Sequence, residues 1–344
     1  MIIAIPKETL NSETRVAATP ETTQHFVRMG LNVVIESNAG ISAGFTDAEY
    51  SKVGAIISNT QTIYQKAHII IKIHAPQIDE ISMLLKKQII IADFSNASSL
   101  QSLADKKTTC FALERIPRIS RAQTMDILTS QSNLAGYKAV INAATLLKRN
   151  LPLMMSAAGT LSPAKVLVIG TGIAGLQAIA TAKRLGAQVF ASDIRPETKE
   201  QVISLGAKFI DMNDISAQLP KTNILITSAT IMGKTAPKLI TNKMLDEMPR
   251  NSVIIDMAAA SGGNVEGIEN NKTIYRNGLI LSGNSNLAAE IPDSSSRTFS
   301  QNILNFLTPW FNAESKCFNF DFSDEIIAKT CIINNGKIIS KEKK

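Results

Sequence analysis

Short runs of β-branched residues alternate with helical segments through the first third of the chain. Four apolar runs predict strands, and their nearly continuous hydrophobic character is typical of a parallel sheet buried on both faces. These runs are Ile2–Ile5, Asn32–Glu36, Ile69–Ile73 and Ile89–Asp93. The segment Pro20–Met29 predicts a helix that ends at Gly30, a suitable C-cap. The alternation indicates a sheet with helices on its faces.

The same alternation starts again after a long helical stretch, Ser130–Arg149, which is interrupted only by Gly136 and is placed to link two domains. The later elements are predicted at Val166–Ile169, Leu176–Leu185, Gln188–Ser192, Ile224–Thr227, Ser252–Asp256, Leu279–Ser282 and Gln301–Leu307. We therefore predict an α/β protein with two Rossmann-like, doubly wound parallel-sheet domains separated by a cleft. The first domain is expected to comprise residues 1–128 plus 300–344, and the second, which carries the glycine-rich turn described below, residues 129–299.

Composition narrows the class of protein. The 44% apolar and 19% charged residues of a 344-residue chain describe a globular protein with room for two domains. The net charge of +7 comes from scattered basic residues, and with one Trp and four Tyr the chain offers few stacking platforms, so nucleic acid is not an expected partner. Cys110, Cys317 and Cys331 form no metal-binding pattern and suit reduced thiols in the cytoplasm. No run approaches the roughly 18 to 20 apolar residues of a membrane helix.

A glycine-rich turn directly follows the predicted strand Val166–Ile169. Its glycines, Gly170, Gly172 and Gly175, have the spacing of a dinucleotide-binding turn: the first makes the turn, the second admits a pyrophosphate, and the third lets the helix pack on the strand. The start of the helix that follows offers unpaired N–H groups to phosphates, and Ile173 and Ala174, within the turn, are expected to bind the cofactor as well.

An acidic residue, Asp193, ends the next predicted strand at the distance expected for the ribose-binding residue, about 20 positions on. Its carboxylate would accept hydrogen bonds from the adenosine ribose and repel a 2′-phosphate, which favours NAD over NADP. Ile194 and Arg195 follow it and are expected at the same site. Arg195 weakens the expected preference for NAD over NADP, because an arginine can accommodate the 2′-phosphate.

Candidate acid–base residues are few. Of three histidines, His25 and His68 suit packing positions, whereas His74 and Lys72 end the strand Ile69–Ile73, where α/β active sites gather. A hydride transfer between two nicotinamides needs no proton transfer to the substrate, which would account for the lack of an obvious pair. The segment Arg115–Asp126 holds three arginines, a glutamine and an aspartate. It is either a solvated loop or a segment of a site at the domain junction.

Long motifs give the chain a specific resemblance. They are Arg115–Asp126 (RIPRISRAQTMD), Ser132–Val140 (SNLAGYKAV), Pro163–Ala187 with its glycine turn, and Ser192–Pro196 (SDIRP). The resemblance runs over nearly the whole chain, from Pro6–Glu8 and Arg15–Ala17 to Asn302–Phe306. In these motifs the chain closely resembles the NAD(H)-binding component of proton-translocating NAD(P) transhydrogenase, the separate alpha-1 subunit of a split enzyme, which is related to alanine dehydrogenase.

The resemblance implies a nicotinamide site at Arg118, Gln123 and Asp126, with Gln123 holding the carboxamide and the other two forming an ion pair. It also implies that Ser228–Pro237 is a mobile loop over the nucleotide and that Asp256 with Gly262–Asn264 lines the site. The further nucleotide-binding residues expected on this basis are Thr129, Ser228, Ala229, Gly233, Asp256 and Gly263.

The implied reaction is Re/Si-specific transfer of hydride from NADH to NADP+ held on a partner subunit. The implied assembly is a homodimer with an NADP(H)-binding beta subunit and a small membrane alpha-2 subunit, which couple the reaction to proton translocation. The chain itself is then cytoplasmic and peripheral on the membrane through these partners.

Two other interpretations stay open. Alanine dehydrogenase shares the Pro6–Glu8, Arg15 and Lys72 pattern, but its catalytic histidine and aspartate are replaced here by Phe94–Asn96 and by Ala260–Ser261. A non-catalytic NAD-sensing module would keep the glycine turn and Asp193 without needing Gln123. The chain also departs from the transhydrogenase pattern at Ala288–Glu290, where the family commonly has Pro-Ser-Arg.

Overall fold

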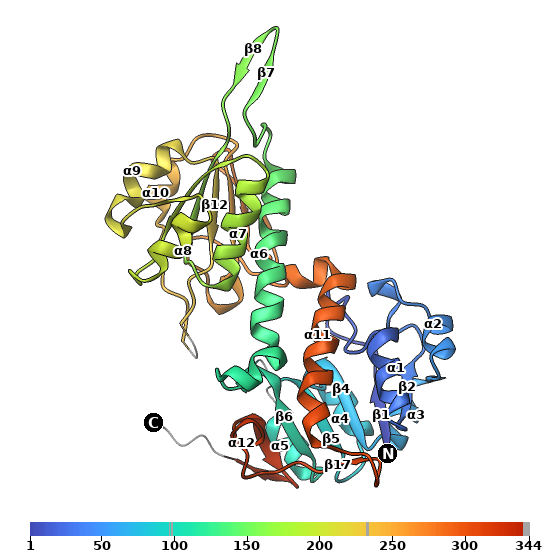
Figure 1. Ribbon diagram of the computed structural model, residues 1–344. Coiled ribbons are helices and arrows are strands. Elements are labelled where there is room, and N and C mark those ends of the chain that lie inside the picture. The colour runs from blue at the N-terminus through green and yellow to red at the C-terminus, as the bar shows by residue number, and fades with distance from the viewer. Residues whose placement is uncertain (96, 98, 232–233, 340–344) are drawn as a thin grey trace. The chain divides into compact units, whose positions relative to one another are not determined.

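The computed structural model describes residues 1–95, 97, 99–231 and 234–339. These residues form two compact units, one made of Met1–Gln131 and the chain from Ile291 onward, the other of Ser132–Glu290 (Figure 1). Each unit is built on one large, mostly parallel sheet. The helix α6 (Ile127–Leu146) begins in the first unit and continues into the second.

The sheet of the first unit has the strand order β3-β2-β1-β4-β5-β6, extended by β18 and β19. Its strands are β1 (Ile2–Ile5), β2 (Asn32–Glu36), β3 (Ile56–Ser58), β4 (Ile69–His74), β5 (Ile89–Asp93), β6 (Thr109–Ala112), β18 (Cys331–Asn334) and β19 (Lys337–Ile338). Neighbours from β3 to β6 are parallel, and β18 runs antiparallel to β6. The order reverses between β1 and β4, which makes their carboxyl ends the switch point of this sheet.

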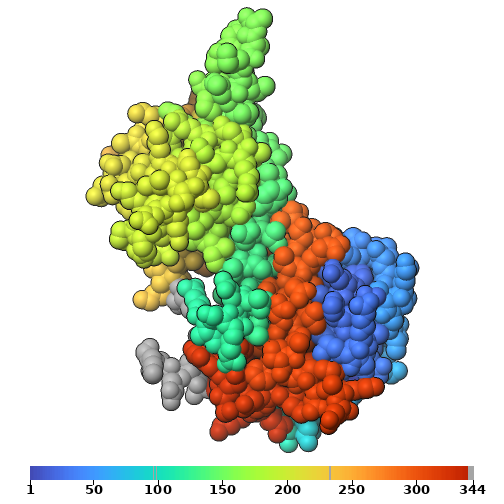
Figure 2. Space-filling model, viewed as in Figure 1, coloured from blue at the N-terminus to red at the C-terminus, as the bar shows by residue number. Residues whose placement is uncertain are grey.

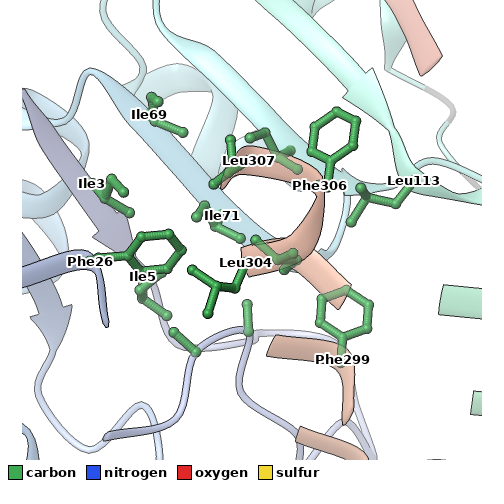
Figure 3. Close-up of a cluster of buried hydrophobic side chains, with 14 of the residues drawn as sticks. Ile3, Ile5, Phe26, Ile69, Ile71, Leu113, Phe299, Leu304, Phe306 and Leu307 are labelled. Carbon is green, nitrogen blue, oxygen red and sulfur yellow. The ribbon is translucent and has the colours of Figure 1, made fainter. Parts of the chain in front are cut away.

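Helices cover both faces of this sheet: α1 (Pro20–Arg28), α2 (Asp47–Lys52), α3 (Thr60–Lys66), α4 (Ile78–Met83), α5 (Leu100–Asp105), α11 (Pro292–Leu307) and α12 (Glu325–Thr330). Side chains of α11, among them Phe299, Leu304 and Leu307, pack against Ile3 and Ile71 of the sheet (Figure 3). The sequence predicted only the last turns of α11, because its first turns, Asp293–Arg297, are polar.

The second unit repeats the design with the order β11-β10-β9-β12-β13-β15-β14, all parallel except β14. Its elements are β9 (Lys165–Ile169), α7 (Ile173–Arg184), β10 (Gln188–Ser192), α8 (Thr198–Ser204), β11 (Lys208–Phe209), α9 (Ile215–Gln218), β12 (Ile224–Thr227), α10 (Asn242–Asp246), β13 (Val253–Asp256), β14 (Thr273–Arg276) and β15 (Leu279–Ser282). Apolar clusters lie on both faces of the sheet. The predicted α/β class with two Rossmann-like parallel sheets is confirmed.

One element of the second unit was not predicted. The strands β7 (Met154–Ser156) and β8 (Gly159–Leu161) pair as an antiparallel hairpin, with Met154 opposite Leu161. Every residue of both strands is exposed, and the hairpin stands clear of the body of its domain (Figure 2). Sequence reasoning failed here because the strands are short and bury no apolar face within their own chain.

The cysteines lie in the first unit. Cys110 on β6 and Cys331 on β18 are buried in separate apolar clusters, and Cys110, Cys317 and Cys331 are free thiols. Burial raises the pKa of Cys110 to about 12. Among the residues that the structure describes, no helix has the length and apolar character to cross a membrane.

Candidate nucleotide-binding site

The glycine turn lies at the switch point of the second sheet, between the carboxyl ends of β9 and β12. Gly170 has φ +91°, a conformation that favours glycine, and the Ser228 hydroxyl donates to its carbonyl over 3.0 Å. A Cβ on Gly175 would lie 1.9 Å from that same carbonyl oxygen. Glycine is therefore required at Gly175 for α7 to begin so close to β9.

The start of α7 faces open space. Gly172 is its N-cap, and a Cβ placed there would have no atom within 4 Å. Ile173 is partly exposed and Ala174 half-buried, and the first N–H groups of a helix have no partner within it. This end of α7 has the free N–H groups, the positive dipole end and the room that a pyrophosphate needs.

Gly136 on α6, which the sequence showed only as an interruption of a helix, has a structural task at this site. A Cβ on it would lie 2.1 Å from the carbonyl oxygen of Ala174. Because Gly136 has no side chain, α6 packs directly against the first turn of α7. This contact supports the turn in which Ala174 lies.

Asp193, directly after β10, is held by two neighbours. Its Oδ2 accepts hydrogen bonds from the Thr171 N–H (2.7 Å) and hydroxyl (3.0 Å), and Arg195 donates from its backbone N–H, Nε and Nη2 at 2.9, 3.0 and 2.9 Å. Burial alone would raise the pKa of Asp193, but the hydrogen bonds from Arg195 and Thr171 outweigh it and hold the pKa well below its usual range. The carboxylate is thus ionised at neutral pH. Ile194, beside it, is 81% exposed.

A buried scaffold supports the loop that follows β12. Asp256, at the end of β13, accepts hydrogen bonds from the backbone N–H groups of Ala258, Asn264 and Val265, while its burial raises its pKa. The Asn264 side chain accepts from the Ala229 N–H and donates to the carbonyls of Ala229 (2.8 Å) and Pro237 (2.9 Å). Sequence reasoning missed this role of Asn264, which holds together the two ends of Ser228–Pro237.

Two glycines of this region, Gly263 and Gly233, were also expected to contact the nucleotide. Gly263 is buried, and a Cβ on it would lie 2.3 Å from Ile268 and 2.8 Å from the Asp256 carboxylate. Gly233 lies outside the described residues. Nucleotide contacts by Asp256, Gly263 and Gly233 stay predictions.

The segment predicted to meet the nicotinamide belongs to the first unit. It forms a 3-10 turn, Ser120–Met125, in which Gln123 is exposed, and Arg118 just before it is exposed too. The side-chain amides of Asn302 and Asn305 on α11 donate to the Thr124 carbonyl at 2.7 and 3.0 Å. The backbone of this turn is thus fixed from α11, while the Gln123 side chain is left available.

Asp126 has a different partner from the one that the resemblance implies. Its carboxylate accepts hydrogen bonds from the Thr129 N–H (3.0 Å) and hydroxyl (2.6 Å) and so caps the start of α6. No ion pair between Arg118 and Asp126 occurs among the described residues. Arg121 is the arginine of this segment that pairs, with Asp324 at 2.6 Å. The cap offers a local reason for this arrangement, because the helix start already occupies both oxygens of Asp126.

With this geometry in view, comparisons with known proteins identify the family. Family descriptions match nearly the whole chain: "Alanine dehydrogenase/PNT, N-terminal domain" over residues 4–135 and "Alanine dehydrogenase/PNT, C-terminal domain" over residues 139–341. The chain belongs to the alanine dehydrogenase/PNT family.

Relatives within this family include transhydrogenase subunits and alanine dehydrogenases. The chain is 40% identical to the first polypeptide of the divided NAD(P) transhydrogenase alpha subunit of Rhodospirillum rubrum, with 98% of each chain covered. The solved structure of a transhydrogenase from Sinorhizobium meliloti is 40% identical and superposes with a TM-score of 0.94 over 98% of this chain and 100% of that one. A solved L-alanine dehydrogenase is 25% identical, with a TM-score of 0.87 over 98% and 97% of the two chains. The resemblance drawn from the sequence motifs is confirmed.

A buried charge cluster lies at the switch point of the first sheet. Lys72, 1% exposed, contacts the carboxylates of Glu80 (2.8 Å) and Glu8 (3.4 Å). Burial alone would lower the pKa of Lys72, but these two carboxylates raise it. Arg15 makes a two-pronged contact with Glu13, whose Oε2 lies 2.8 Å from His74 Nε2. The sequence singled out Lys72 and His74 but missed the three glutamates that pair with this cluster.

The departure at Ala288–Glu290 is accommodated within the second unit. Glu290 contacts Lys138 at 3.4 Å and Asn142 at 2.8 Å on α6, and it also accepts a hydrogen bond from Asn284. An acidic residue therefore pairs with a lysine of the motif Ser132–Val140 here. Glu290 is thus the centre of the polar contacts of this segment.

Proposed function

We propose that this chain is the NAD(H)-binding subunit of an NAD(P) transhydrogenase and passes hydride from NADH to NADP+ held on a partner subunit. The observation that carries the proposal is the combination at the second switch point of a glycine turn, an open helix start and an ionised acidic residue. Gly172 leaves room for the pyrophosphate, the first turn of α7 supplies N–H donors, and Asp193 is placed for the adenosine ribose.

The exposed Gln123, with Arg118, Asp126 and Thr129, supplies the groups we assign to the nicotinamide end. NADH would bring the hydride, and the protein's role is to position the ring, since exchange between two nicotinamides requires no general acid or base.

Two positions separate the proposal from alanine dehydrogenase. Phe94, directly after β5, is buried, and its N–H donates to Glu114; Asn96 lies outside the described residues. Ala260 and Ser261 form a 3-10 turn beside the glycine pair. Neither Phe94 nor Ala260 can carry a proton, and the residues needed to accept one from an amino acid are therefore replaced.

The test is a reconstitution with purified components. The chain alone should quench or enhance NADH fluorescence on binding and should form no NADH from NAD+ and alanine. After addition of the NADP(H)-binding beta subunit of a related transhydrogenase, it should catalyse hydride exchange from NADH to a spectrally distinct NADP+ analogue. Alanine-dependent NADH formation would overturn the proposal, and NADH binding without exchange in the mixture would favour the NAD-sensing module.

The partners we propose follow from the same assignment: the NADP(H)-binding beta subunit and a small membrane alpha-2 subunit. Through these partners the chain sits at the cytoplasmic face of the membrane, and hydride exchange is coupled to proton translocation.

The proposed homodimer is supported by exposed apolar residues on the chain's own surface. Leu153, Met154, Met155 and Leu161, on and beside the β7–β8 hairpin, are 56%, 51%, 79% and 57% exposed. An isolated two-stranded hairpin with an apolar surface is marginally stable and is typical of a contact with a second chain.

We therefore expect the double variant M155E/L161E to shift the protein from dimer to monomer. Charges on a buried interface carry a large desolvation penalty, whereas on an exposed hairpin of the monomer they cost little. Light scattering after gel filtration measures the mass. The matched control is I203E on α8, where the isoleucine is 54% exposed, and it should stay dimeric. A dimer that survives the double variant, or a control that also dissociates, would rule out the hairpin as the contact.

A further inference from the structure

The Asp193 carboxylate has its hydrogen-bond acceptor positions filled by donors of its own chain. A carboxylate offers about four acceptor positions, and Asp193 already receives five donors, two from Thr171 and three from Arg195. The hydroxyls of an adenosine ribose would have to find acceptor positions on these same oxygens. Binding of NAD(H) as proposed above therefore requires that some donor leaves.

The donors differ in how easily they leave. Thr171 is 1% exposed and lies in the glycine turn, so neither its N–H nor its hydroxyl can withdraw without moving the turn. The backbone N–H of Arg195 is fixed by the loop after β10. The Arg195 guanidinium, in contrast, stands on a flexible stem with the side chain 50% exposed, and exposed ion pairs of this kind contribute little net free energy.

We propose that Arg195 is an internal competitor of the adenosine ribose and a determinant of coenzyme choice. Its Nε and Nη2 donate to the Asp193 oxygens, and they rotate away when the ribose hydroxyls of NAD(H) take their place. The inference rests on the proposed function and adds to it the group that ribose binding displaces. A glycine turn and an aspartate alone would not require any group to leave when the ribose binds. The two-pronged contact of Arg195 with Asp193 does require it, because it occupies the acceptor positions that the ribose needs.

The same guanidinium has the opposite effect on a nucleotide with a 2′-phosphate. The Asp193 carboxylate repels the phosphate, and the guanidinium, already beside that carboxylate, is a cation with the planar fork that binds phosphate well. Arg195 thus lowers the affinity for NAD(H) and raises the affinity for a 2′-phosphorylated nucleotide. Removing it should sharpen the discrimination in favour of NAD(H).

The experiment compares R195A with R184A in the full-length chain. Arg184 is exposed in the last turn of α7, so its replacement removes the same charge from the same domain. NADH affinity is measured by fluorescence titration, and adenosine 2′,5′-bisphosphate, which carries the 2′-phosphate, is measured by its displacement of NADH. In R195A we expect NADH to bind about two- to fivefold more tightly and the bisphosphate more weakly by a similar factor, the range that an exposed ion pair allows. R184A should change neither.

A further variant, R195K, separates charge from geometry. Lysine keeps a cation but loses the fork, so NADH should bind more tightly than in the wild type while the bisphosphate loses less than in R195A. Parallel weakening of both ligands in R195A would overturn the inference, because it would make Arg195 a direct contact or a structural support. Unchanged affinities would also overturn it, as would a bisphosphate that does not displace NADH from the wild type. Failure of the wild type to bind NADH would instead refute the proposed function itself.

Discussion

Replacing Gly175 by alanine is expected to abolish measurable NADH binding and to destabilise the nucleotide domain. The added Cβ would lie 1.9 Å from the Gly170 carbonyl oxygen, far inside contact distance, and this oxygen belongs to the backbone, so it cannot rotate away as a side chain could. Relief requires α7 to move away from β9, which displaces the N–H groups that face the phosphates. Overpacking of this kind costs about 1 to 3 kcal/mol of folding free energy. Fluorescence titration with NADH and a thermal melt followed by circular dichroism measure the two losses.

Gly172→Ala is the matched control, because the same atom is added three residues earlier in the same turn. Gly172 has φ −72°, which any residue adopts, and its Cβ would meet no atom within 4 Å. We expect the melting temperature to stay close to that of the wild type while NADH binding falls roughly 10- to 100-fold, since the methyl enters the space assigned to the pyrophosphate. If G172A binds NADH normally, the pyrophosphate does not lie over this turn.

The elements that the sequence predicted well are those whose signal is local. The strand Gln188–Ser192 is predicted with the bounds that the structure shows, because five successive residues form a buried strand between two loops. The glycine turn is predicted for the same reason: Gly170, Gly172 and Gly175 lie within six residues, and the strand and helix that they join flank them directly. Motifs of this kind carry their structural context with them.

What the sequence could not supply are pairings between distant side chains. Lys72 and Arg15 carry charges whose partners are glutamates, and nothing in the spacing of Glu8, Glu13 and Glu80 shows which cation each one meets. Such pairs depend on the tertiary fold, since acidic residues elsewhere in the chain are chemically equivalent to them until strands and helices bring particular ones together.

The support of the predicted nicotinamide segment shows the same limit. Asn302 belongs to a motif that resembles the family, yet its role, to hold the Thr124 carbonyl and accept a hydrogen bond from Ser130, joins residues more than a hundred positions apart. Gln123 is exposed on this fixed turn, and its contact with a nicotinamide stays a prediction. The predicted pairing of Arg118 with Asp126 was not found, because Asp126 caps a helix whose start the sequence placed at Ser130, three residues later than Ile127.

Gln123→Asn is expected to slow hydride transfer in the reconstituted enzyme by roughly 100-fold while NADH affinity changes by no more than about twofold. Asparagine keeps the amide but shortens its reach by one methylene. The backbone cannot follow to compensate, because Asn302 and Asn305 hold the carbonyl of the neighbouring Thr124. The amide would thus miss the carboxamide by about 1 Å, an error that affects the geometry of transfer far more than the binding of the whole nucleotide. Single-turnover exchange with the beta subunit measures the rate, and fluorescence titration measures affinity.

The control carries the same substitution at Gln61, an exposed residue of α3 in the same unit, and should leave both the rate and the affinity unchanged. Equal losses of rate and affinity in Q123N would show that Gln123 stabilises bound NADH and its transition state alike, and would remove it from the transfer step. A loss confined to the rate requires instead that the amide acts where the two nicotinamides meet. Because the proposed function assigns the second nicotinamide to a partner subunit, such a loss would also support the proposal that this turn of the first unit belongs to the surface on which the partner docks.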